Sequence, residues 1–202
     1  MATADLGVWE PFGVASVQAL MAGTEVTWWL SGGVALDVFV DRPTRAHADI
    51  DISVRRSDFP AFRRFVTGKV MLKIARNGHL HELADEPLGL DVHGLWARET
   101  STGPWRLQVN LEPVESGDWI YRREPRVRVP LEHVIRRRED GLPYVAPAVQ
   151  LLWKAKDPRP EDCADFDLIA PLLDVHERRW LADAISLCHP ASTWPATLVG
   201  CT

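Results

Sequence analysis

The chain has few cysteines and no long apolar run, and each absence excludes classes of protein. Its 202 residues contain three cysteines, Cys163, Cys188 and Cys201, which are far apart and all in the last quarter of the sequence. An odd, scattered set fits neither a disulfide framework nor a Cys-x-x-Cys zinc site. No apolar run approaches the roughly eighteen residues that a membrane span needs, and the first residues lack a basic segment followed by an apolar core. We therefore expect a soluble, cytoplasmic protein without a membrane partner.

An excess of basic charge is also absent. Lysine and arginine number 23 against 28 aspartates and glutamates, and the formal net charge is -5. A dedicated nucleic-acid binder usually shows the opposite imbalance, so this composition favours a small substrate over DNA or RNA. The chain also lacks a Gly-x-Ser-x-Gly elbow and a Walker Gly-x-x-x-x-Gly-Lys loop, which disfavours acyl transfer and P-loop hydrolysis.

A diglycine turn follows the first expected strand. Residues 26–30 are β-branched, aromatic and apolar, which favours a buried strand, and Ser31-Gly32-Gly33 ends it. Glycines let backbone N–H groups approach a phosphate closely. Residues 34–40 then favour a short helix whose N-terminal N–H groups would point at the same anion. The segment therefore predicts a phosphate-binding turn.

Two carboxylates follow on the next expected strand. In residues 49–54 polar and apolar residues alternate, so Asp49 and Asp51 should share one face over a hydrophobic backing. Such a pair would repel, and one pKa would rise, unless a cation lay between the groups. Mg²⁺ is the ion that best suits carboxylate and phosphate oxygens together.

In this order and spacing, Ser31-Gly32-Gly33 and Asp49-Ile50-Asp51-Ile52 resemble the signature of the DNA polymerase β-like nucleotidyltransferases. The connecting segment Arg42-Pro43-Thr44-Arg45-Ala46-His47-Ala48 is similar to that of the small group that modifies aminoglycosides and lincosamides, with Asp41 where that group often has glycine. The resemblance implies an α/β (α+β) nucleotidyltransferase fold, in which a mixed twisted sheet is flanked by helices and followed by C-terminal helices.

The same resemblance implies an activity and a set of site residues. The activity is transfer of a nucleoside monophosphate, AMP, from ATP or another nucleoside triphosphate to a hydroxyl of a small molecule such as an aminoglycoside or lincosamide. Asp49, Asp51 and a third acid would bind Mg²⁺ and carry catalysis. Nucleotide binding would fall to Ser31, Gly32, Gly33, Arg45 and a lysine on a later helix.

Glu112 is the predicted third acid. Apolar and polar residues alternate over 105–114, which indicates a strand whose polar face ends at Glu112. A carboxylate there could face Asp49 and Asp51 across the sheet and accept the proton of the acceptor hydroxyl. The competing acids are Asp91, Glu115 and Asp118, and the alternative for Glu112 is an exposed strand end.

Lys154 is the predicted lysine. Pro147 suits the first residue of a helix over 147–156, and the resemblance places a phosphate-binding lysine on this helix. Lys154 is preferred to Lys156, and either could instead be a solvated helix residue. Arg122 and Arg123 could reach the triphosphate, although runs of charge usually mark a solvated face.

The rest of the pattern predicts the outline of the fold. Helices are expected over 11–21, 57–67, 162–173 and 175–187, and strands over 70–75, 79–83 and 90–98. The proline-punctuated segment 156–162 suggests a linker, and we expect the last dozen residues to be poorly ordered. We divide the chain into a catalytic domain, residues 1–145, and a C-terminal helical segment, residues 146–202.

Two other functions fit the same pattern. The chain could keep the fold and act as a non-catalytic or regulatory module of the toxin/antitoxin type, or it could modify tRNA through its arginine-rich segment. The sequence leaves open the acceptor, the nucleotide and the oligomeric state.

Overall fold

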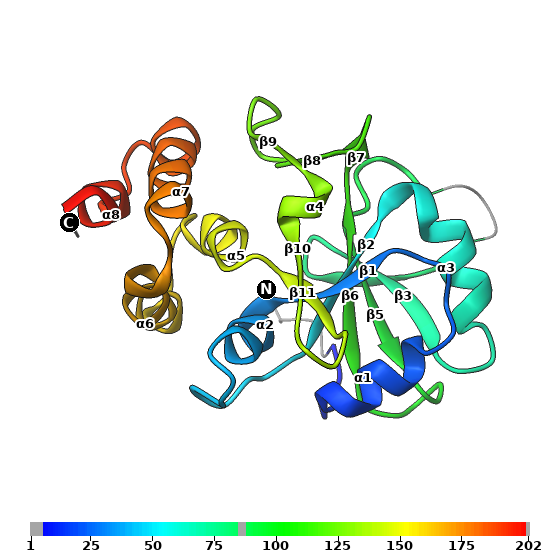
Figure 1. The fold of residues 1–202 in the computed structure, drawn as a ribbon. Helices are drawn as coiled ribbons and strands as arrows, with labels where there is room; N and C mark the ends of the chain where they lie inside the picture. Colours follow the sequence, from blue (N-terminus) through cyan, green and yellow to red (C-terminus); the bar gives the residue numbers. More distant parts are fainter. Residues whose placement is uncertain (1–5, 85–87, 201–202) are drawn as a thin grey trace. The chain divides into compact units, whose positions relative to one another are not determined.

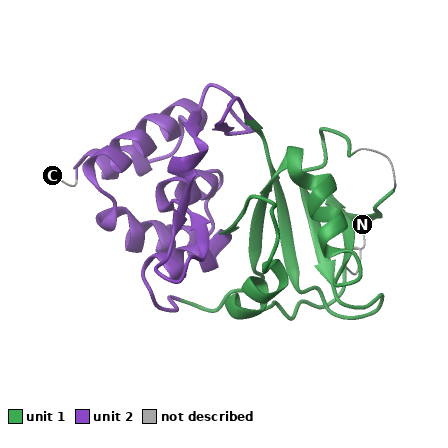
Figure 2. Ribbon diagram, turned by 45° about the vertical axis from the view of Figure 1, so that its right-hand side comes forward, with its two compact units in different colours: residues 1–30, 45–114 green, residues 31–44, 115–202 purple. Residues whose placement is uncertain are grey.

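The computed structural model describes residues 6–84 and 88–200, which divide into two compact units (Figure 2). Unit 1 takes in the chain up to Leu30 and Arg45–Val114, and unit 2 takes in Ser31–Thr44 and the chain from Glu115 onward. The chain therefore leaves unit 1 at the diglycine turn, returns before the two aspartates, and leaves again at residue 114. This division differs from the expected boundary at 145/146, because the helix after the diglycine turn packs on the C-terminal helices.

Six neighbouring strands of unit 1 form a sheet in the order β1-β2-β6-β5-β3-β4 (Figure 1). Their bounds are Trp28–Ser31 for β1, Asp51–Arg55 for β2, Met71–Arg76 for β3, His79–Glu82 for β4, Gly94–Arg98 for β5 and Leu107–Glu112 for β6. β2 and β6 run parallel, whereas β6–β5, β5–β3 and β3–β4 are antiparallel. The predicted mixed sheet is confirmed, and each expected strand is present with its ends shifted by a few residues.

The core of unit 1 is built on the central strands. Ile52, Val54, Val109 and Leu107 are fully buried, and burying an aliphatic side chain of this size contributes about 1.5–3 kcal/mol. The helices of this unit are α1, Val14–Met21, the 3-10 turn η1, Arg56–Asp58, and α3, Phe59–Val66. α3 packs on β2 through buried residues spaced three and four apart, Phe59, Phe62 and Val66. β2 is therefore buried at nearly every position, and its polar residues are held rigidly.

Unit 2 is mostly helical. Its helices are α2, Gly32–Phe39; α4, Leu131–Val134; α5, Pro147–Lys154; α6, Pro160–Ile169; the 3-10 turn η2, Ala170–Leu172; α7, Val175–Cys188; and α8, Trp194–Gly200. Its short strands are β8, Asp118–Ile120; β9, Arg128–Pro130; β10, Ile135–Arg137; and β11, Pro143–Val145. β7, Val114–Glu115, lies at the boundary between the units. β8 pairs with β9 and β10 with β11, both antiparallel.

The C-terminal helices surround α5, which packs against α2, α6 and α7. α7 begins with a capping box, in which Asp174 accepts a hydrogen bond from the Glu177 N–H at 2.8 Å. The expectation of poor order after residue 190 is wrong: α8 forms there, and Trp194 stacks on Phe166 with ring centroids 4.1 Å apart. No helix within residues 6–84 and 88–200 has the length and apolar character to cross a membrane.

Candidate active site

The first part of the candidate site is the start of β2 in unit 1. Asp51 is the first residue of the strand and is buried, with 9% of its surface exposed, whereas Asp49 precedes the strand and is exposed. Pairing with β6 already begins between these two residues, because the Ile50 carbonyl accepts a hydrogen bond from the Gln108 N–H at 2.9 Å. Asp49 therefore lies in solvent just before the strand, and Asp51 lies at the edge of the core as its first residue.

Asn110 on β6 is the residue whose side chain contacts Asp51. Its Nδ2 donates a hydrogen bond to Asp51 Oδ1 at 3.1 Å. The register explains this contact, because Asn110 lies opposite Ser53, two residues from Asp51 on the same face of β2. An amide thus stands at the position on the neighbouring strand where we expected an acid.

Glu112 lies elsewhere along the same face. It is buried, with 6% exposed, and pairs in register with Arg55, four residues beyond Asp51. At about 3.3 Å per residue, this register separates Glu112 from Asp51 by roughly 13 Å along the strands. The geometry does not support the expectation that Glu112 faces Asp51. Within the described part of the chain, no three His, Cys, Asp or Glu side chains form a group that could hold a metal ion.

Two of the three competing acids have basic partners. Asp91 is exposed and forms an ion pair with Arg76, whose hydrogen bond lowers the pKa of the Asp91 carboxyl. Glu115 lies 3.4 Å from Arg128, and Asp118 is the first residue of β8. None of these contacts places a second carboxylate beside that of Asp51.

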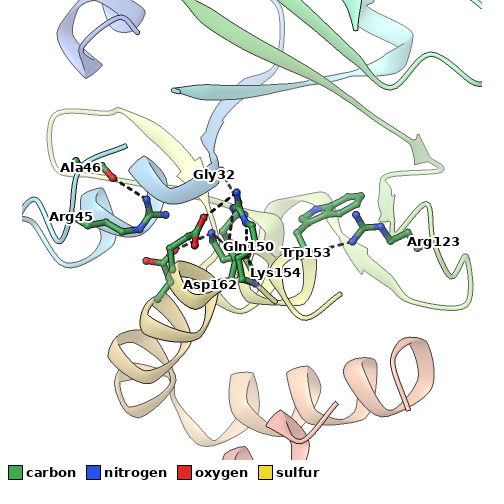
Figure 3. Close-up of polar contacts among 11 residues, drawn as sticks. Gly32, Arg45, Ala46, Arg123, Gln150, Trp153, Lys154 and Asp162 are labelled. Atoms are coloured by element: carbon green, nitrogen blue, oxygen red, sulfur yellow. Dashed lines mark hydrogen bonds and ion pairs between the residues drawn. The ribbon is translucent and has the colours of Figure 1, made fainter. Parts of the chain in front are cut away.

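The diglycine turn belongs to unit 2. Gly32 has a φ of 73°, which strongly favours glycine, and it begins α2. Its N–H donates to Gln150 Oε1 on α5 at 2.8 Å (Figure 3). The side chain of Asp37 on α2 accepts hydrogen bonds from the backbone N–H of Thr44, at 3.1 Å, and from its hydroxyl. Gln150 and Asp37 therefore fix the turn and the end of the loop that follows it.

Arg45, the next residue of that loop, belongs to unit 1. Its guanidinium donates to the carbonyl of Ala46 at 3.1 Å (Figure 3) and is half-buried. The side chain is thus folded along the loop that leads to Asp49.

Lys154 is buried in an ion cluster of unit 2. Its Nζ lies 2.7 Å from Asp162 Oδ1 (Figure 3) and 2.9 Å from Asp165 Oδ2, and both aspartates are on α6. Burial raises the pKa of Asp162, but hydrogen bonds from Arg159 and Lys154 outweigh that effect and lower it well below its usual range. Two carboxylates so close to one ammonium favour a structural role for Lys154. Lys156 is exposed.

Arg122 and Arg123 lie on an aromatic cluster of unit 2. Their guanidinium carbons are 5.0 and 4.9 Å from the ring centroid of Trp153. Arg123 also donates to the Trp153 carbonyl (Figure 3) and to the hydroxyl of Tyr121, both at 3.2 Å. Both arginines are exposed, as expected of a solvated face, and their guanidinium groups also stack on the ring of Trp153.

Sequence reasoning missed the polar residues that contact the predicted ones. Gln108 and Asn110 were visible as the polar face of a strand, yet nothing in the pattern marked Asn110 as a partner of Asp51. Gln150 and the α6 aspartates gave no signal either, because their contacts join residues that are far apart or on separate helices.

Three solved structures of antibiotic-modifying enzymes are similar to this chain. The lincosamide antibiotic adenylyltransferase LnuA, bound to lincomycin, has a TM-score of 0.52 at 17% identity, covering 76% of this chain and 92% of that chain. The solution structure of the antibiotic-resistance factor ANT(2'')-Ia has a TM-score of 0.58 at 16% identity, covering 88% and 91%. ANT(2'')-Ia in complex with adenylyl-2''-tobramycin has a TM-score of 0.56 at 14% identity, covering 86% and 95%. The fold is that of the nucleotidyltransferases, as the sequence implied.

A match to a family model identifies the family of this chain. The profile of the family described as Aminoglycoside-2''-adenylyltransferase matches residues 13–122, which is more than half of the chain. The protein belongs to this family of adenylyltransferases, and the resemblance to aminoglycoside and lincosamide nucleotidyltransferases is confirmed. A comparison with curated proteins yields no match.

Proposed function

We propose that this protein is a magnesium-dependent adenylyltransferase that moves AMP from ATP to a hydroxyl group of an aminoglycoside or lincosamide. The observation that carries the proposal is the family match, because residues 13–122 include both the diglycine turn and the two aspartates, Asp49 and Asp51. The neighbouring structures support the choice of acceptor, since one is bound to lincomycin and another to an adenylylated tobramycin.

The residues at the start of β2 fit a magnesium ion. Mg²⁺ binds proteins through one or two carboxylates, completing its shell with substrate phosphates and water. Asp51, held by a neutral amide, and Asp49, exposed two residues earlier, provide such a pair. When bound there, the ion would offset the charge of the triphosphate and polarise the phosphate under attack. We assign metal binding to Asp49 and Asp51, and Glu112 is not included because of its register with Arg55.

The remaining roles follow from the chemistry of each group. The backbone of Gly32-Gly33 and the hydroxyl of Ser31 can donate hydrogen bonds to phosphate oxygens at the start of α2. Gln150 Oε1 already accepts from the Gly32 N–H, as a phosphate oxygen would. The guanidinium of Arg45 suits a phosphate because it presents several donors in one plane. Lys154 is left out, since its charge is matched by Asp162 and Asp165.

Transfer of labelled nucleotide tests the proposal directly. The purified protein is incubated with Mg²⁺ and each of the four labelled triphosphates, with tobramycin, lincomycin or tRNA as acceptor. We expect label from ATP on an antibiotic, release of pyrophosphate, and no transfer after magnesium is chelated. Nucleotide binding without transfer to any acceptor would contradict the proposal and favour the non-catalytic module, and transfer to tRNA alone would favour tRNA modification.

Variants at β2 identify the residues. Asp51→Asn and Asp49→Asn should each lower the transfer rate by more than about 100-fold, because even groups that only support metal ligands account for 10–100-fold. Asp183→Asn, an exposed carboxylate on α7, is the matched control and should leave the rate unchanged. Full activity of the Asp51→Asn variant would show that β2 does not take part in the active site.

A further inference from the structure

A row of hydrogen-bonded side chains crosses three strands of unit 1 and ends at Asp51. Trp96 on β5 donates through Nε1 to Gln108 Oε1 at 3.2 Å. Gln108 Nε2 donates to Asn110 Oδ1 at 3.1 Å, and Asn110 Nδ2 donates to Asp51 Oδ1 at 3.1 Å. We call Trp96, Gln108 and Asn110 the amide relay.

The strand register brings these side chains together. Trp96 lies directly opposite Gln108 in the antiparallel pair β5–β6, and Gln108 and Asn110 are two residues apart on the same face of β6. Gly94 is the residue opposite Asn110 on β5, so no β5 side chain occupies that place. Side chains opposite or diagonal to each other on one face are within hydrogen-bonding reach.

Trp96, the first member of the relay, determines which atom donates in each of its hydrogen bonds. An indole N–H can only donate, so Gln108 must present its carbonyl oxygen to Trp96 and its amide nitrogen to Asn110. Asn110 must then present its oxygen to Gln108 and its nitrogen to Asp51. An ionised carboxylate can only accept, so the last contact satisfies both ends. The chemistry at Trp96 therefore determines that Asp51 faces a donor.

The first member of the relay is itself held by aromatic packing. The ring centroid of Trp96 lies 4.9 Å from that of Trp9 and 5.6 Å from that of Trp105, both edge to face. Aromatic pairs in this geometry are favourable beyond their buried area. The indole is therefore a rigid anchor for the two amides.

We propose that the amide relay positions Asp51 for the metal, and that Asn110 acts as a hydrogen-bond donor and not as a further metal ligand. The inference rests on the proposed function, because it names a set of positioning residues for that site. By holding one carboxylate oxygen with a neutral donor, the relay fixes the plane of the carboxylate without adding a cation that would compete with the metal. Partners of this kind typically account for 10–100-fold in metal affinity or activity.

Two substitutions at one position separate a donor from a ligand. Asn110→Ala removes the donor, and Asn110→Asp keeps the size of the side chain but replaces the donor with an acceptor. If Asn110 is a donor, both variants should bind Mn²⁺ about 10–100-fold more weakly, and Asn110→Asp should be at least as impaired as Asn110→Ala. If position 110 takes part as a ligand, the added carboxylate should strengthen Mn²⁺ binding, and that result would overturn the proposal.

The upstream members give a graded series. Trp96→Phe keeps the aromatic packing but removes the indole donor, so it should weaken Mn²⁺ binding less than Asn110→Ala does. Trp9→Phe is the matched control, because it retains an aromatic contact with Trp96 and contributes no atom to the relay. An effect of Trp9→Phe equal to that of Trp96→Phe would show that packing, and not the hydrogen bonds, is responsible.

Mn²⁺ binding is measured by electron paramagnetic resonance on the full chain with a non-hydrolysable ATP analogue, and the melting temperature is recorded for each variant. A lower melting temperature with unchanged Mn²⁺ affinity would mean a purely structural role and would overturn the proposal, as would a wild-type protein that does not bind Mn²⁺. A wild type that binds Mn²⁺ but transfers nothing would refute the proposed function, while the series would still test the relay.

Discussion

Two groups of carboxylates in this protein lie in opposite electrostatic settings. In unit 2, Asp162 and Asp165 surround the ammonium of Lys154, with Arg159 also donating to Asp162 at 2.9 Å. In unit 1, Asp51 accepts a hydrogen bond from the neutral amide of Asn110, and Asp49 two residues earlier lies in solvent. Cations match the carboxylates of the first group, whereas the Asn110 amide that donates to Asp51 carries no charge.

The difference fits the roles we propose, in which the unit 2 group is structural and the residues at the start of β2 bind a cation. A buried carboxylate that is matched by a fixed ammonium gains little from another cation and becomes costly when its partner is lost. A carboxylate oriented by an amide keeps its charge for a ligand, since the hydrogen bond stabilises it without neutralising it. The predictions that follow test this contrast through the free energy of unfolding.

The largest effect is expected at the centre of the unit 2 cluster. Lys154→Met leaves two buried carboxylates without their ammonium and should lower the free energy of unfolding by about 3–5 kcal/mol, measured by urea denaturation. Lys156→Met, two residues on and exposed, is the control and should change stability by no more than about 0.5 kcal/mol. A Lys154→Met variant of normal stability with a raised KM for ATP would instead support the predicted phosphate contact.

Asp162→Asn should have a smaller, pH-dependent effect. At pH 7 it should cost about 1.5–3 kcal/mol, the range for hydrogen bonds to charged groups. Because the pKa of Asp162 in the folded state is lowered below its unfolded value, near 3.9, the stabilisation is complete above that value and is lost as pH falls through the folded pKa. The stability difference between wild type and variant should therefore shrink below about pH 4. A difference that stays constant down to pH 2 would show that ionisation of Asp162 does not stabilise the cluster.

Gly32→Ala tests the diglycine turn that opens unit 2. A methyl group at a φ of 73° should cost about 1–2 kcal/mol, measured by thermal and chemical denaturation. Gly13→Ala is the control, because φ there is −78° and an added Cβ meets no atom within 4 Å. Equal losses of stability in both variants would show that the positive φ of Gly32 is not the reason for the cost of replacing it.

The smallest change in stability is expected at the carboxylate that we assign to the metal. Asp51→Asn keeps an oxygen that can accept from Asn110, so the free energy of unfolding should change by no more than about 1 kcal/mol, although transfer is lost. A loss as large as that of Lys154→Met would remove the contrast between the two groups of carboxylates.

Much of the framework could be predicted from local patterns. The alternation over 49–54 and 105–114 placed strands within two residues of β2 and β6, because period-two patterns reflect burial of one face. Pro147 marked the start of α5 for a similar local reason. The order of the diglycine turn and the two aspartates was enough for the family, which the match over 13–122 confirms.

Tertiary structure decided which of the predicted side chains meet. The sequence determined that a buried strand begins at Asp51, just after Asp49, and that Gly32 begins a helix, since those properties depend on neighbouring residues. Only the register of β2 with β6 places Asn110 rather than Glu112 beside Asp51, and only the packing of α5 on α6 places Lys154 between two aspartates. A shift of two residues in that register would give every polar side chain on this face a different partner. The register depends on contacts between distant segments, so the local sequence does not determine it.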